Sequence, residues 1–107
     1  MAYDLKLAER IRSKLDEMPF IEKKMFGGVG FLLNGNMLVG VWKTSLIVRV
    51  GPEQYDEALA EEYVQKFDIT GREMRGWVLV DADGVESDAQ LKAWIDRGVS
   101  FVQDLPK

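Results

Sequence analysis

The sequence has 107 residues, of which 47% are apolar, so it is long enough to bury one hydrophobic core. It contains no cysteine and no histidine, which excludes disulfides, thiolate chemistry and the commonest general base and metal ligand. We therefore expect a single domain over residues 1–107 with no cofactor, no metal site and no catalytic residues. No segment approaches the ~18 consecutive apolar residues of a membrane span, and the N-terminus lacks an apolar signal core. A cytoplasmic protein without membrane association is expected.

The net charge of −4 is distributed unevenly along the chain. Residues 1–50 carry eight lysines and arginines against five acidic residues, whereas residues 51–107 carry six against thirteen. One interpretation is a basic patch at Lys23 and Lys24, extended by Lys6, Arg10 and Lys14. The other is a solvated helix face beside a charged strand edge, which we favour because nucleic-acid-binding domains are usually basic overall.

The first predicted elements are a helix over residues 4–18 and a strand over residues 21–26. Apolar side chains recur at helical spacing in the first segment, Asp4 is a suitable N-cap, and Pro19 ends the helix. In the second segment Glu22 and Lys24 alternate with apolar neighbours, which is typical of an exposed edge strand.

An Asn34-Gly35 pair between two apolar segments predicts a hairpin with a two-residue turn, because both residues accept positive φ. With Leu33 opposite Asn36, the register places Phe31 opposite Leu38. One face of the hairpin would then carry Leu32, Met37, Val39 and Val41, and the other Val29, Phe31, Leu33 and Leu38.

The remaining elements follow from turn and capping signals. A turn at residues 42–45 leads to a strand over residues 46–50, and Gly51-Pro52 begins a helix with a buried stripe of Tyr55, Ala58, Leu59 and Tyr63. Residues 74–81 form another strand, and Ser87 with Gln90 is a capping box for the last helix. The order α-β-β-β-β-α-β-α describes an α+β fold with an antiparallel sheet of about five strands and three helices.

Sequence fragments that resemble catalytic or ligand motifs are incomplete. Gly27, Gly28 and Gly30 lack the further glycine and the following helix that a dinucleotide-binding loop needs. Asp81 and Asp83 begin like a calcium loop, but the remaining oxygen ligands are missing. An enzyme, such as a methyltransferase, therefore lacks support beside a binding module.

Both faces of the predicted sheet are apolar, although an antiparallel sheet with one covered face should alternate with polar residues. Three helices could cover both faces. If they gather on one face, the other presents a candidate interaction surface, and a homodimer or a complex with a protein partner would bury it. This surface comprises Phe31, Leu38, Trp42 and Ile47, with Arg49 beside it.

The chain resembles the TfoX N-terminal domain. The most specific part of the resemblance is Met25-Phe26-Gly27-Gly28, followed by Gly30 and the Asn34-Gly35 hairpin, with Arg49 on the next strand. It implies helices packed on an antiparallel sheet, similar to secretion-chaperone architecture, and a regulatory or interaction role without catalytic activity. The competence regulators that give the family its name also carry a separate C-terminal domain, which we do not expect here. We predict a non-enzymatic binding or regulatory module, with direct nucleic-acid binding as the alternative.

Overall fold

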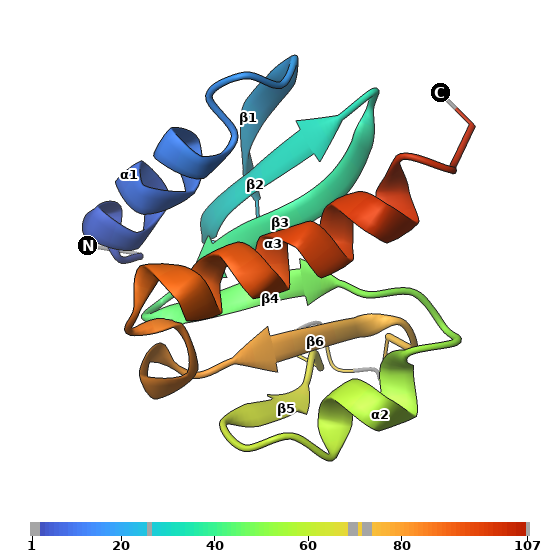
Figure 1. The fold of residues 1–107 in the computed structure, drawn as a ribbon. Helices are drawn as coiled ribbons and strands as arrows, with labels where there is room; N and C mark the ends of the chain where they lie inside the picture. The colour runs from blue at the N-terminus through green and yellow to red at the C-terminus, as the bar shows by residue number, and fades with distance from the viewer. Residues whose placement is uncertain (1–2, 26, 69–70, 72–73, 107) are drawn as a thin grey trace.

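The fold is an antiparallel sheet with helices on one face, seen in a computed structural model that describes residues 3–25, 27–68, 71 and 74–106 (Figure 1). The described helices are α1 (Leu5–Lys14), α2 (Tyr55–Leu59) and α3 (Asp88–Val102), with a 3₁₀ turn, η1 (Ala82–Val85), before α3. The described strands are β1 (Phe20–Met25), β2 (Gly28–Leu33), β3 (Asn36–Trp42), β4 (Ser45–Arg49), β5 (Val64–Lys66) and β6 (Trp77–Val80). They form one sheet in the order β1-β2-β3-β4-β6-β5. The predicted α+β class is confirmed, with one additional strand.

Both predicted N-caps are confirmed. The carboxylate of Asp4 accepts hydrogen bonds from the backbone N–H groups of Lys6 and Leu7 at 2.9 and 3.1 Å. At α3, the hydroxyl of Ser87 and the side chain of Gln90 form the reciprocal capping box. These bonds satisfy N–H groups that have no partner inside the helix.

Helix α1 ends at Lys14, four residues before the predicted end at residue 18. The next residues include Asp16 and Glu17, whose negative charges are unfavourable at the C-terminal end of a helix dipole. The chain turns instead, and the N–H of Met18 donates to the carbonyl of Leu15.

The predicted second helix is also too long. Only Tyr55–Leu59 is helical, and Tyr63 has φ of +67°, which a right-handed helix cannot contain. Tyr63 is 45% exposed, so its assignment to a buried stripe was wrong. Its carbonyl accepts from the N–H of Asp81 at 2.7 Å, and this bond starts the pairing of β5 with β6.

The central hairpin has the predicted turn but a different register. Asn34 and Gly35 have φ of +54° and +83°, and Leu33 lies opposite Asn36. A bulge at Leu38 then shifts the pairing, so that Phe31 lies opposite Val39. The predicted pairing of Phe31 with Leu38 was wrong, and the faces change accordingly.

The bulge allows two successive residues of β3, Leu38 and Val39, to join the core beneath the helices. A Cβ added to Gly98 of α3 would lie 2.8 Å from Cδ1 of Leu38, so this leucine fills the space that the glycine leaves. The helix-covered face therefore contains residues that the regular register assigned to opposite faces, namely Val29, Phe31, Leu33, Leu38, Val39 and Val41.

Gly35→Val should lower the free energy of unfolding by about 1–3 kcal/mol, because it forces a β-branched residue into the left-handed region. A Cβ at this position would contact no atom within 4 Å, so the cost comes from the backbone alone. Thermal unfolding would measure this as a loss of several degrees. Gly35→Asn is the control that should keep most of the stability, since asparagine tolerates positive φ.

Candidate interaction surface

The five residues of the predicted interaction surface do not lie together. Phe31 and Leu38 are fully buried in the core beneath α1 and α3, so their place on an exposed face was wrong. Trp42 and Ile47 belong to a second apolar cluster on the opposite face of the sheet, which we call the outer face. Ile47 is only 2% exposed, whereas Trp42 is partly exposed.

Part of the outer face is covered by the chain itself. Ile47 of β4 and Leu79 of β6 pack with Phe67, which follows β5 and is 1% exposed. The ring of Phe67 lies 6.0 Å from that of Trp77. This part of the outer face is internal core and offers no binding surface.

The remainder of the outer face, on β1 to β3, presents apolar side chains to solvent. Ile21 is 60% exposed and lies opposite Leu32 in the β1–β2 pairing. Met25, Leu32 and Trp42 are partly exposed, and Met37 lies between them at 9%. We call this set the open patch, and its members are Ile21, Met25, Leu32, Met37 and Trp42.

Two methionines of the open patch lie over glycines. A Cβ added to Gly30 would be 3.0 Å from Sδ of Met25 and 3.2 Å from Cε of Met37, and one at Gly40 would be 2.7 Å from the same Cε. The sheet is therefore flat beneath flexible thioether side chains. Methionine can change its conformation at little cost, which suits a surface that adapts to a partner.

The charged side chains that β1 to β4 and the turn between β3 and β4 place on this face are cations. Lys23 lies opposite Gly30 between Ile21 and Met25, Nζ of Lys43 is 4.6 Å from the centre of the Trp42 ring, and Arg49 shares the face of Ile47. None of these three cations has a carboxylate within 4.0 Å in the part of the chain that the structure describes. Burial lowers the pKa of the Arg49 guanidinium, which lies 5.0 Å from the Trp77 ring and 5.5 Å from the ring of Phe101 on α3, at the end of the sheet and away from the open patch.

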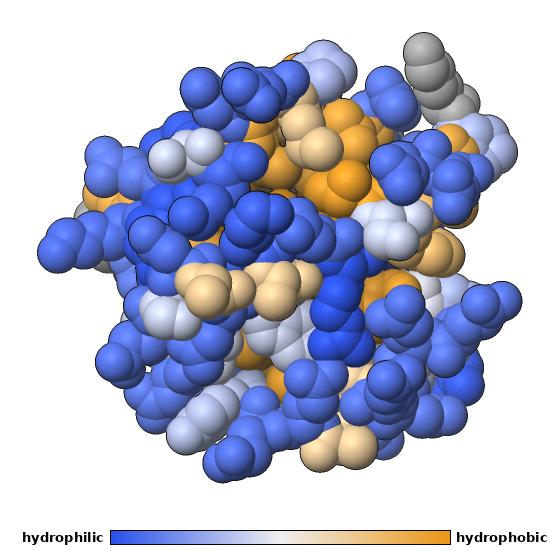
Figure 2. All heavy atoms as spheres, viewed as in Figure 1, coloured by the Kyte–Doolittle hydropathy of each residue, from blue (hydrophilic) through white to orange (hydrophobic). Residues whose placement is uncertain are grey.

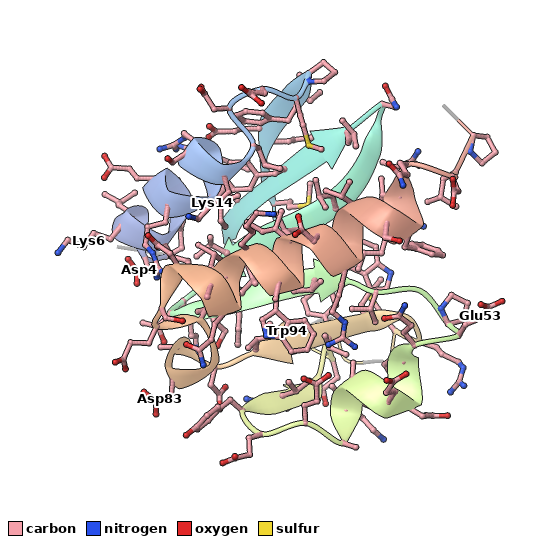
Figure 3. All side chains as sticks on the ribbon, in the orientation of Figure 1. Asp4, Lys6, Lys14, Glu53, Asp83 and Trp94 are labelled. Carbon is pink, nitrogen blue, oxygen red and sulfur yellow. The ribbon has the colours of Figure 1, made fainter. Side chains whose placement is uncertain are left out.

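The candidate basic patch is divided between surfaces. Lys23 and Lys24 are successive strand residues, so their side chains point to opposite faces of the sheet. Lys14 lies between α1 and α3, whereas Lys6 points away from the sheet (Figure 3). Arg10 and Lys14 both approach Asp88, at 3.5 and 3.7 Å, so much of this positive charge is neutralised.

A further ion pair removes charge from the same region. Glu22 of β1 bonds with two nitrogens of Arg12 of α1, and this bond raises the pKa of Arg12. It also fixes Glu22 on the helix side, so that no acidic residue of β1 to β4 projects from the outer face.

The helix side is mostly hydrophilic, with apolar side chains visible between α1 and the C-terminal half of α3 (Figure 2). Trp94 projects from α3 over the sheet and is 7% exposed (Figure 3). Within the described ranges, no group of three His, Cys, Asp or Glu residues could hold a metal ion. No helix among these residues is long and apolar enough to cross a membrane.

Sequence reasoning missed most of the open patch. Leu32 and Met37 were assigned to the helix-covered face because the bulge at Leu38 leaves no clear signal in the sequence. The signal that could have identified the patch is the exposed edge strand, in which Ile21 and Met25 share a face with Lys23.

Comparison of the sequence with known protein families gives a match. The sequence model of the TfoX N-terminal domain matches residues 15–102, which is most of the 107-residue chain. Searches with the same chain found no matching curated protein and no matching solved structure.

Proposed function

The chain belongs to the TfoX N-terminal domain family, and from this premise we propose that it is a non-enzymatic module that binds a protein partner through the open patch. Membership in the family supports a regulatory or binding role in general. The observation that carries the proposal is the exposed apolar set on β1 to β3, where Ile21 is 60% exposed. Contiguous apolar surface of this kind marks protein interaction sites.

The partner could be a second copy of the chain or a different protein, and the charges favour the different protein. A two-fold dimer through the open patch would pair this patch of one copy with the same patch of the other. Lys23 and Lys43 of one copy would then lie close to the lysines of the other, with no carboxylate on this face of β1 to β4 to compensate. Nucleic-acid binding is the weaker alternative, because the basic residues of the N-terminal half are dispersed or paired.

A photo-activated cross-linking amino acid placed at Leu32 in living cells should yield a defined protein adduct. The same amino acid at Ala89, which is exposed on α3 at the helix side, is the matched control and should yield none. Trp42→Asp should reduce the Leu32 adduct by at least tenfold, because it removes a large apolar side chain from the open patch and adds charge to it.

The mass of the adduct distinguishes the alternatives. A mass of two copies of the chain would identify a homodimer, and sedimentation of the purified protein at tens of micromolar would then show a dimer. Equal yields from positions 32 and 89, or no adduct at either, would contradict binding through the open patch.

A further inference from the structure

We propose that the open patch binds an amphipathic helix of a partner protein whose apolar stripe is flanked by aspartate and glutamate. This inference rests on the proposed function and adds the chemistry of the partner. It follows from three properties of the patch, which are its width, its adaptable centre and its unpaired cations.

The width of the patch suits one helix. The patch extends over three neighbouring strands, from Ile21 on β1 to Trp42 on β3. Two strand spacings amount to about 10 Å, which matches the diameter of an α-helix of about 10–12 Å. The opposite face of the same sheet is covered in this manner by α1 and α3 (Figure 1). A helix on the outer face would add a third layer of the kind that sheets commonly carry.

The centre of the patch can accept large apolar side chains. Met25 and Met37 lie over Gly30 and Gly40, and their contacts with these glycines involve only the ends of flexible side chains. Rotation of a methionine would open the flat strip beneath it without displacing the backbone. Methionine-lined surfaces of this type accommodate bulky apolar residues on a bound helix.

The positive charge at the open patch favours a partner helix with acidic residues on both sides of its apolar stripe. Arg10, Arg12, Lys14, Arg75, Lys92 and Arg97 each have a carboxylate partner within the chain. The two lysines at the patch, Lys23 and Lys43, have none among the described residues. A protein with a net charge of −4 thus presents a locally positive face, and complementary charge on a partner would steer and orient its docking.

A nucleic acid fits this face less well. Surfaces that bind single strands stack successive bases on several aromatic side chains, whereas most of the open patch is aliphatic or thioether and Trp42 is its single aromatic member. The second tryptophan of the outer face, Trp77, already contacts the ring of Phe67 and the guanidinium of Arg49. The cations would therefore contact carboxylates of a protein.

The test is a selection of helical peptides on the purified full chain. The library contains peptides of roughly 18 residues, or five helical turns, with a fixed leucine and phenylalanine stripe and randomised flanking positions. We expect enrichment of aspartate and glutamate at the flanks. Enriched peptides should bind the variant Lys23→Glu/Lys43→Glu at least tenfold more weakly than the wild type. The matched control is Lys6→Glu/Lys92→Glu, which makes the same charge change on exposed helix positions and should leave binding unchanged.

Other outcomes would overturn the inference in distinguishable ways. Peptides with neutral or basic flanks that lose binding in Trp42→Asp would remove the acidic partner but keep the patch as a binding surface. Enriched peptides that bind Trp42→Asp as well as the wild type would remove the patch itself. Binding of a poly(dT) or poly(U) oligonucleotide at physiological salt, lost in Lys23→Glu/Lys43→Glu, would assign the cations to phosphates.

Discussion

Phe31→Asp is expected to abolish cooperative folding. Phe31 is fully buried in the core beneath the helices, and its ring lies 5.8 Å from that of Phe20. Loss of a buried phenylalanine side chain costs about 3–5 kcal/mol, and burial of an unpaired carboxylate adds several more. Because the total stability of a domain of this size is about 5–15 kcal/mol, the variant should show no thermal transition by circular dichroism.

Trp42→Asp is the matched change on the outer face, and it should remain folded. Trp42 is partly exposed at the end of β3, so we expect a loss of about 1–2 kcal/mol and a retained cooperative transition. The two variants make the same change in charge on the two sides of one sheet. A folded Phe31→Asp protein beside an unfolded Trp42→Asp protein would reverse the assignment of the two faces.

Gly28→Ala is the second substitution for which we expect a large effect. A Cβ at Gly28 would overlap the backbone carbonyl oxygen of Val41 on β3, and a backbone atom cannot move aside without disturbing the pairing of β2 and β3. We expect a loss of about 3 kcal/mol, which corresponds to a decrease in Tm of about 15 °C. Differential scanning calorimetry would measure it.

Gly30→Ala, two residues further along the same strand, is the control. The three atoms nearest to its Cβ would be Sδ and Cε of Met25 and Cε of Met37, at 3.0 to 3.2 Å, and these flexible ends can move. The expected loss is below about 1 kcal/mol. Similar effects of the two substitutions would show that the strand, and not the particular contact with Val41, limits which residues are tolerated.

The sequence predicted those elements whose signals are local. Asp4 and Ser87 cap helices through bonds to residues two or three positions away, and Asn34-Gly35 determines its own turn. In β6, Val78 and Val80 join the core beneath the helices while Trp77 and Leu79 lie on the outer face, a regular alternation that the sequence shows directly because β6 has no bulge.

Prediction of the candidate site required a contact between residues that are far apart in the sequence. The bulge at Leu38 fits the space beside Gly98, which lies sixty positions further along the chain, and no pattern within β3 indicates it. An error of one residue in register moves every subsequent side chain to the other face of a strand. The predicted surface therefore included Phe31 and Leu38, which are core residues, and omitted Leu32 and Met37.

Strand β5 was missed for a related reason. Its three residues, Val64–Lys66, are too few to show a period, and they follow a segment whose composition suits a helix. The strand forms because Tyr63 adopts positive φ and its carbonyl bonds to the N–H of Asp81.

The two edges of the sheet bear on how this protein behaves when it is concentrated. β1, at one edge, presents Glu22, Lys23 and Lys24 to solvent, and β5, at the other, is only three residues long. Charged and very short edge strands are poor templates for the addition of further strands. The protein should therefore resist growth into fibrils through its backbone, and its association with other molecules should depend on side chains.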